Sequence, residues 1–340
     1  MRIGIMSFAH LHAESYVNNL RNILDVELIG FSDTDAERGK YFANLFNVRW
    51  FPTHESLLAE QVDGVVVCSE NANHHQLVEM AAHAGAHILC EKPIEVNLAD
   101  AEAMRDVCLS HQVNFMTAFP SRFMPSAQAV KAMLDRGDLG NIYGVNGINH
   151  SEIPREHRAW FAQKALAGGG AVMDHTVHLV DLLRWFFGCE VVEVYAEVDN
   201  LFYPGEVDVD TAGIVLLTLA NGVIASIDCS WSRPTYYPRW GHLKFDVVGD
   251  NGFTVVDVLS QYHTVYSKAG PRNPTWVNWG SDSDQAMMNE FASSIREKRQ
   301  PSVTWRDGFE ALRVALACYE SGRQGQPVKL AHNGSVATTG

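Results

Sequence analysis

Residues 1–120 alternate short apolar runs with amphipathic segments, and this alternation limits the possible folds more than any other feature of the chain. Five apolar runs predict β-strands, at 3–7, 27–32, 64–68, 87–90 and 114–118. Segments between them, such as 76–84 and 98–110, have the spacing of amphipathic helices. Strands that alternate with helices build a parallel sheet with right-handed crossovers. The sequence therefore predicts an N-terminal Rossmann-like domain of the α/β class.

The second half of the chain has longer strands with an alternating pattern. They are predicted at 142–150, 191–198, 211–219, 223–230, 243–248 and 253–258. A strong helical pattern at 171–187 interrupts them, and two more follow at 284–297 and 307–321. Turn signals such as Asn221-Gly222 favour antiparallel hairpins. We predict a C-terminal α+β domain with a largely antiparallel open sheet over 121–330, and a flexible tail at 331–340.

This second domain predicts association of subunits. An antiparallel sheet that is covered by helices on one face leaves its other face to be buried. Contact between identical subunits is the usual way to bury such a face. We expect a homodimer or a homotetramer.

Composition and charge argue against several classes of protein. The formal net charge of −14 repels nucleic acid and anionic membranes, so neither is an expected partner. No run of about 18 apolar residues occurs, and the chain enters a strand pattern at once, without the zones of a signal peptide. The six cysteines lie far apart, which is typical of reduced, buried thiols. We expect a cytoplasmic enzyme that acts on a small molecule.

The turn after the first predicted strand is where a Rossmann domain binds a dinucleotide. If Ser7, Ala9 and His12 occupy the glycine positions of G-x-G-x-x-G, all three glycines are substituted. The N–H groups that begin the following helix still suit a phosphate, with His10 or His12 as extra donors. Alternatively, the histidines belong to the loop and have no role in binding. We predict cofactor contacts across this segment, which we call the nucleotide turn: Ser7, Phe8, Ala9, His10, Leu11 and His12.

Asp33 follows the second predicted strand, a little over 20 residues beyond the nucleotide turn. A carboxylate at this place accepts hydrogen bonds from the adenosine ribose and repels a 2′-phosphate. The sequence therefore favours NAD over NADP. The alternative is that Asp33 only begins the turn before the next helix.

A lysine and two helical residues are the candidates for chemistry. Lys92 lies at the carboxyl end of a predicted buried strand, where open α/β sheets bind ligands. Asp174 and His178 are four residues apart in the helical pattern and therefore share a face. Asp174 is placed to hydrogen-bond His178 or to stabilise its charge, and a nearby carboxylate favours the protonated imidazole. Asp181, one turn later, is expected to pair with Arg184.

Three blocks of sequence resemble the Gfo/Idh/MocA family of nicotinamide-dependent sugar and polyol oxidoreductases. They are 65–74 (VVVCSENANH), 90–93 (CEKP) and 168–181 (GGGAVMDHTVHLVD), in the family's order and spacing. The resemblance implies a Rossmann domain, an open-sheet domain and an active site between them, lined by Lys92, Asp174 and His178. Two departures stand out. The nucleotide turn lacks glycine, and Thr176 replaces a usual glycine, which we expect to alter the wall of the substrate pocket.

The resemblance and these residues together predict an NAD-dependent dehydrogenase. The substrate is a secondary alcohol of a sugar, glycoside or cyclitol. His178 is the predicted general base, Asp174 orients it, and Lys92 stabilises the developing alkoxide or relays its proton. Two alternatives stay open: an NAD-dependent glycoside-cleaving enzyme of the same family, and a regulatory protein that senses a dinucleotide or sugar without turnover.

Further contacts are predicted from position in the chain. The cofactor candidates outside the nucleotide turn are Asp33, Ser69, Asn71, His74, Glu91, Lys92 and Arg122, although Arg122 can instead pair with Glu91 and His74 can instead be structural. The substrate candidates are His175, Trp160, Tyr236 and Trp240. Aromatic rings suit the apolar faces of a sugar, but they also favour subunit contacts. No metal site is predicted, because Asp174 and His175 are adjacent on a helix and point in different directions.

Overall fold

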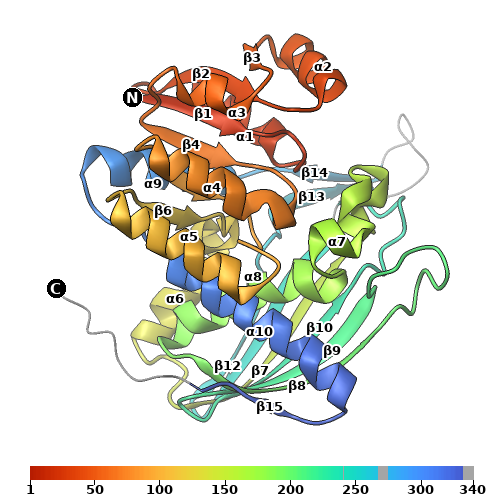
Figure 1. Cartoon of the computed structure of the whole chain (residues 1–340). Coiled ribbons are helices and arrows are strands. Elements are labelled where there is room, and N and C mark those ends of the chain that lie inside the picture. The colour runs from red at the N-terminus through yellow and green to blue at the C-terminus, as the bar shows by residue number, and fades with distance from the viewer. Residues whose placement is uncertain (240, 267–274, 332–340) are drawn as a thin grey trace.

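The first sheet is parallel throughout and lies in the N-terminal part of the chain (Figure 1). The computed structural model describes residues 1–239, 241–266 and 275–331. The strands are β1 (Arg2–Met6), β2 (Glu27–Ser32), β3 (Trp50–Phe51), β4 (Gly64–Val67), β5 (His87–Cys90) and β6 (Phe115–Thr117), in the order β3-β2-β1-β4-β5-β6. All neighbouring pairs are parallel. The predicted Rossmann-like sheet is confirmed, and β3 escaped prediction because two residues carry no periodic pattern.

Helices connect these strands and bury their apolar stripes against the sheet. They are α1 (Ala13–Arg21), α2 (Ala36–Phe46), α3 (His54–Leu58), α4 (His74–His83) and α5 (Leu98–Ser110), with a short 3-10 turn, η1 (Asn71–Asn73), before α4. All four residues of β4 are buried, as expected of a central strand with helices on both faces. The carboxyl ends of β1, β4 and β5 therefore lie along the same edge of the sheet, next to the nucleotide turn and Lys92.

The second sheet has seven strands and is mixed. They are β7 (Ile142–Ser151), β8 (Val191–Asp199), β9 (Ala212–Leu219), β10 (Ile224–Ser230), β11 (Gly241–Gly249), β12 (Gly252–Asp257) and β15 (Val328–Lys329), in the order β12-β11-β7-β10-β9-β8-β15. The central β7–β10 pair is parallel, and the other pairs are antiparallel. A separate hairpin joins β13 (Tyr262–Val265) and β14 (Thr275–Asn278). The predicted α+β domain with a largely antiparallel sheet is confirmed.

Helices cover one face of this sheet. The remaining helical elements are η2 (Pro120–Phe123), α6 (Pro125–Asp135), η3 (Pro154–Glu156), η4 (Ala159–Ala162), α7 (Lys164–Ala167), α8 (Ala171–Phe187), α9 (Ser283–Arg296) and α10 (Trp305–Gln324). Figure 1 shows α8 and α10 between the second sheet and the first domain. The helix α9 returns to the first domain and packs on α1. There, Phe291 and Ile295 contact Gly64, where no side chain larger than glycine fits without displacement.

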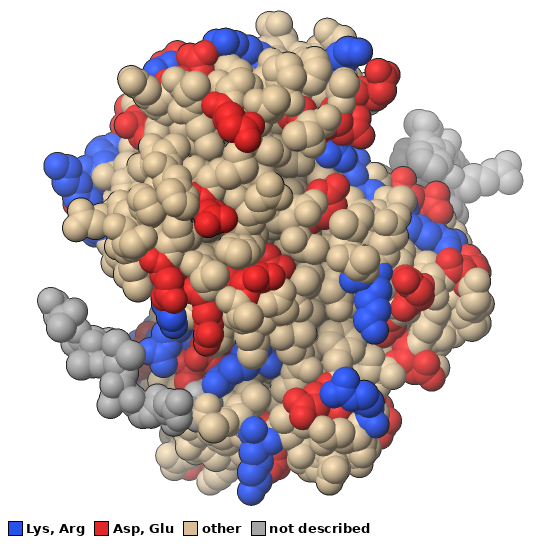
Figure 2. Space-filling model, in the orientation of Figure 1, with Lys and Arg blue, Asp and Glu red and all other residues tan. Residues whose placement is uncertain are grey.

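The surface is charged but has no dominant basic region on the face shown in Figure 2. Lysine and arginine side chains are interspersed there with aspartate and glutamate. None of the described helices has the length and apolar character needed to cross a membrane.

Candidate active site

A cavity of about 350 Å³ lies where the carboxyl edge of the first sheet meets α8. It is lined by His10, Leu11, His12, Lys92, Pro120, Ser121, Asn149, Pro154, Phe161, Asp174, His175, His178, Leu243 and Leu259. The first four residues come from the first domain, and most of the others come from the second. The cavity therefore brings the predicted lysine and the predicted helical pair together.

Lys92 and Asp174 form a buried ion pair across this cavity. Lys92 Nζ lies 2.6 Å from Asp174 Oδ1, and the lysine is 4% exposed. The second carboxylate oxygen of Asp174 lies 3.3 Å from His175 Nε2 and accepts a hydrogen bond from Trp231 Nε1 at 3.3 Å. Burial opposes ionisation, but Lys92 and His175 hold the pKa of Asp174 well below its usual range. The carboxylate of Asp174 thus stays charged at neutral pH.

His178 lines the same cavity but is not hydrogen-bonded to Asp174 within the described part of the chain, in contrast to one arrangement that the four-residue spacing allowed. The carboxylate of Asp174 is instead taken up by Lys92, His175 and Trp231. Burial and the Lys92 ammonium hold the pKa of His178 well below its usual range, and Asp174 opposes this shift only in part. Asp174 favours the protonated ring, as expected, but burial and Lys92 outweigh it, so the neutral form of His178 is favoured.

His175 belongs to the wall of the cavity. Its Nε2 lies 3.0 Å from Ser151 Oγ, and its backbone carbonyl accepts a hydrogen bond from Asn149 Nδ2 at 3.3 Å. Both partners lie on β7, so this strand fixes the start of α8. The side chain of Asn149 also reaches the cavity, which the sequence analysis missed because a lone asparagine in a strand carries no signal.

Glycines and a distant carboxylate place the beginning of α8. A Cβ at Gly169 would lie 2.0 Å from Tyr319 Oη, and one at Gly170 would lie 1.8 Å from the Asp210 carbonyl oxygen. Asp210 accepts hydrogen bonds from the N–H groups of Gly170 and Val172, both at 2.7 Å. The carboxylate caps the helix from outside its own sequence. Asp210 lies about 40 residues away along the chain, so no local motif could reveal it.

The nucleotide turn keeps a tight backbone without glycine. Ser7 has φ +73°, in the left-handed region, and its Oγ accepts a hydrogen bond from Ala9 N at 3.1 Å. The ring of Phe8 is buried against Phe31, 4.3 Å between centroids, so it points into the core. Leu11 lines the cavity. Phe8 therefore contributes to the turn through its backbone alone.

Trp160 packs on the nucleotide turn and does not line the cavity. Its Nε1 donates to the Ala9 carbonyl at 2.9 Å, and Arg158 Nε donates to the same oxygen at 3.1 Å. Trp160 is stacked on Phe161, with 4.0 Å between ring centroids, and Phe161 is the ring that reaches the cavity. The structure therefore does not place Trp160 at the substrate, because its polar atom is used to join the two domains.

Asp33 is buried, and its carboxylate is already satisfied. Arg38 donates two hydrogen bonds to it, at 2.8 and 2.9 Å, and Phe8 N donates a third at 2.9 Å. The carboxylate thus holds the nucleotide turn against the start of α2. The charge that was expected to reject a 2′-phosphate is balanced by a guanidinium.

Of three other cofactor candidates, His74 holds the backbone next to Lys92. His74 Nδ1 lies 3.0 Å from the Pro93 carbonyl, and its Nε2 lies 3.3 Å from the Ser69 carbonyl. Asn71 Nδ2 donates to the Ala167 carbonyl at 2.9 Å and so contacts the segment before the glycines. None of His74, Asn71 and Ser69 is among the residues that line the cavity. The structural alternative for His74 fits this geometry.

Arg122 serves an ion cluster away from the cavity. It donates to Asp181 at 2.6 and 2.8 Å and to Asp307 at 2.9 Å. Arg184 pairs with Glu190 and with Asp307. The expected Asp181–Arg184 and Arg122–Glu91 pairs are therefore wrong, because the buried aspartate of α8 faces η2 rather than the next turn of its own helix. Burial opposes ionisation of the Asp307 carboxyl, but Arg122 and Arg184 lower its pKa to about 2.

Comparison with known proteins now places the chain. Residues 2–119 match the model of the oxidoreductase family with an NAD-binding Rossmann fold, GFO_IDH_MocA, and residues 127–255 match the GFO/IDH/MocA C-terminal domain. The chain belongs to the Gfo/Idh/MocA oxidoreductase family. The family predicted from three short blocks is confirmed.

Relatives of this family resemble the chain along nearly its whole length. The chain is 28% identical to myo-inositol 2-dehydrogenase of Thermotoga maritima, over 97% of this chain and 98% of that protein. It is also 28% identical to D-apiose dehydrogenase of Paraburkholderia graminis, over 96% and 88% of the two chains. The structure of myo-inositol 2-dehydrogenase from Lactobacillus plantarum matches with a TM-score of 0.84 and 25% identity, over 97% and 99%.

Two further residues singled out in the sequence lie outside the cavity of this family member. Thr176 is fully buried and lies 3.6 Å from Cys229 Sγ on β10, so it faces the sheet and does not alter the pocket wall. Tyr236 is 78% exposed and does not line the cavity. Trp240 lies outside the described residues.

Proposed function

We propose that the protein oxidises a secondary alcohol of a sugar, glycoside or cyclitol with NAD, at the cavity that joins its two domains. The observation that carries this proposal is the meeting of the Lys92–Asp174 ion pair with a neutral His178 around one cavity. Oxidation of an alcohol needs two groups at the hydroxyl. A neutral imidazole accepts its proton, and an ammonium stabilises the negative charge that develops on the oxygen. The named relatives are dehydrogenases of inositols and a pentose, which supports this substrate class.

The residues at the nucleotide turn fit a dinucleotide. Leu11 and His12 line the cavity at the amino end of α1, where a helix offers N–H groups to a phosphate. Ser7 supplies the left-handed backbone that glycine gives elsewhere. The dinucleotide, when bound, supplies the acceptor for hydride. Everything else is done by the chain.

The chain's own groups manage the proton and the charge. His178 is neutral and accepts the proton of the substrate hydroxyl. The ammonium of Lys92 stabilises the negative charge that develops on the same oxygen. Asp174 Oδ1 lies 2.6 Å from Lys92 Nζ and holds the ammonium in place. Asn149 and His175 offer hydrogen bonds to further hydroxyls, whereas Phe161 and Leu243 present apolar surface to C–H groups.

A panel of inositols, aldoses, glycosides and sugar acids tests the proposal. Each compound is mixed with the protein and either NAD or NADP, and the absorbance of reduced nicotinamide is followed. We expect at least one polyol or sugar to be oxidised, with NAD preferred. The variant Lys92→Ala is expected to lose roughly 10²–10³ in kcat while it still binds NAD by calorimetry. Lys131→Ala, at a partly exposed lysine on α6 that is paired with Asp135, is the matched control. Full turnover by Lys92→Ala would contradict the proposal.

We also propose that the uncovered face of the second sheet is buried between identical subunits. The proposed location of the protein is the cytoplasm. Large apolar side chains lie exposed on its strands, with Phe253 at 72%, Val255 at 63% and Ile224 at 58%. Exposed apolar side chains on a sheet face favour association. The molar mass in solution, measured by light scattering, should be that of a dimer or a tetramer. The variant Leu216→Lys on β9 should lower this mass towards that of the monomer. Leu109→Lys, an exposed residue of α5, should leave the mass unchanged.

A further inference from the structure

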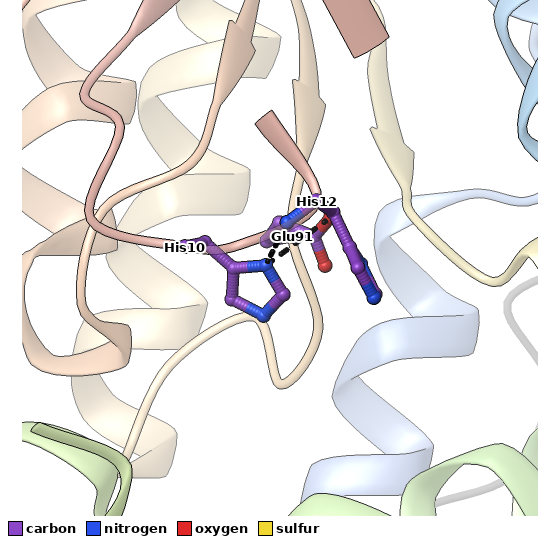
Figure 3. Close-up of side chains that lie close together, drawn as sticks. All are labelled: His10, His12 and Glu91. Atoms are coloured by element: carbon purple, nitrogen blue, oxygen red, sulfur yellow. Dashed lines mark hydrogen bonds and ion pairs between the residues drawn. The ribbon is translucent and has the colours of Figure 1, made fainter. Parts of the chain in front are cut away.

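Two histidines of the nucleotide turn and one glutamate from the end of β5 converge on one point (Figure 3). His12 Nδ1 lies 3.1 Å from Glu91 Oε1, and His10 Nδ1 lies 3.9 Å from the same oxygen. One ligand atom from each of the three residues lies within 4.8 Å of the other two. Among the residues that the structure describes, no other group of three His, Cys, Asp or Glu side chains meets this condition. The cluster has no member in common with Asp174, His175 and His178, although His10 and His12 line the same cavity as these residues.

We propose that His10, His12 and Glu91 bind one divalent transition-metal ion, with zinc as the best match. Two imidazole nitrogens and one carboxylate oxygen form a common zinc ligand set, with bonds of about 2.0–2.2 Å. Around such an ion the ligand atoms lie roughly 3.3 Å apart, so shifts of less than about an ångström bring the observed atoms into place. Three protein ligands leave a fourth position open. Because His10 and His12 line the cavity, that position faces the space shared with Lys92.

The protonation of the cluster suits a cation. Burial opposes ionisation of Glu91, but His10 and His12 lower its pKa, so the carboxylate is charged. Burial lowers the pKa of His10 well below its usual range, so this ring is neutral and has a lone pair to donate. Glu91 raises the pKa of His12 against the effect of burial, and histidine binds a metal ion in its neutral form.

The surroundings orient the ligands. The Tyr16 hydroxyl donates to Glu91 Oε1, and the backbone N–H of Lys92 donates to Glu91 Oε2 at 3.1 Å. Outer hydrogen bonds of this kind fix carboxylate ligands in metal sites. Lys92, the nearest other cation, is neutralised by Asp174. His10 Nδ1, the atom that faces Glu91, accepts a hydrogen bond from the backbone N–H of His12 at 3.2 Å, and the ion would displace this bond.

Metal binding is tested without turnover, so the result is independent of the proposed function. The purified protein is stripped with a chelator and titrated with Zn²⁺ by calorimetry and with Co²⁺ by visible absorption, without nucleotide or substrate. We expect one equivalent of Zn²⁺ per chain and the absorption bands of a tetrahedral Co²⁺ site. His10→Gln and His12→Gln should each weaken Zn²⁺ binding at least tenfold and remove the Co²⁺ bands.

A matched control separates this site from adventitious binding. His83 on α4 lies beside His111, with 4.6 Å between ring centroids, on the exposed surface. His83→Gln should leave both titrations unchanged. Circular dichroism checks that each variant is folded, and His12, with a side chain 29% exposed, is the safer of the two substitutions. Absence of stoichiometric binding to the wild-type protein, or equal binding by folded His12→Gln, would overturn the proposal.

Discussion

The wall of the cavity that carries Lys92, Asp174 and His178 presents charged and polar side chains, whereas the nucleotide turn, which also lines the cavity, contains no glycine. The first wall works through side-chain atoms, so its residue types cannot change without changing the chemistry. In the turn, Ser7 at φ +73° adopts the backbone conformation that glycine usually supplies. A glycine motif therefore indicates a backbone conformation, which other residues can also adopt. Local hydrogen bonds such as Ala9 N to Ser7 Oγ can hold that shape with other residues.

The largest expected effect tests the side-chain wall. His178→Gln keeps a polar group in the cavity but cannot accept a proton at neutral pH. We expect kcat to fall roughly 10²–10⁴-fold, measured as initial rates on a substrate found by the panel, with NAD affinity unchanged. His111→Gln, an exposed histidine, should retain wild-type rates.

The pH profile of the wild-type enzyme sharpens the same test. With His178 in its proposed role as general base, the rate falls as the pH drops through its pKa. Burial and Lys92 lower that pKa, so the acid limb should lie below the ordinary histidine value of about 6.5. The His178→Gln variant should lack this limb. An acid limb above the ordinary value would show that the imidazole is not held neutral.

The second prediction concerns what keeps the side-chain wall in position. Arg122 joins η2 to Asp181 of α8 and to Asp307 of α10, and it is 7% exposed. Arg122→Met leaves a buried carboxylate without its partner, which costs about 3–5 kcal/mol in the free energy of unfolding. Urea denaturation followed by circular dichroism measures it. Arg136→Met breaks an exposed pair with Asp138 and should cost under about 1 kcal/mol. Equal losses in the two variants would show that the buried cluster does not anchor α8.

Periodicity was sufficient to predict most of the fold. The helix at Ala171–Phe187 has the predicted bounds, because its apolar spacing is continuous and Gly170 and Gly188 delimit it. The strand at His87–Cys90 was predicted as well, since it is short, apolar and followed by a proline turn. The parallel pairing of β7 with β10 was not predictable, because each strand has the same alternating pattern in either direction.

The site was predictable where residues act locally and not where partners are distant. The Lys92–Asp174 contact follows from two motifs whose domains must meet. The hydrogen bonds that Asp174 makes were not predictable, because Trp231 and Lys92 approach from other elements and compete with His178. Asp210, which caps α8, and Arg38, which binds Asp33, are also distant or unmarked partners. Burial and packing decide such choices, and a single sequence does not encode them visibly.

The smallest expected effect tests the turn. Arg38 donates two hydrogen bonds to Asp33 and is partly exposed, so its guanidinium balances the charge that would repel a 2′-phosphate. In Arg38→Gln the carboxylate is free to accept ribose hydroxyls and to repel NADP. One charge-assisted hydrogen bond is worth about 1.5–3 kcal/mol when buried, and exposure reduces this. We therefore expect the ratio of kcat/KM with NAD to kcat/KM with NADP to rise roughly threefold to tenfold.

Lys40→Gln removes the same charge from an exposed site on α2 and should leave this ratio unchanged. A fall in the ratio for Arg38→Gln would mean that Arg38 supports NAD binding, and that the turn selects its cofactor through the guanidinium rather than through Asp33.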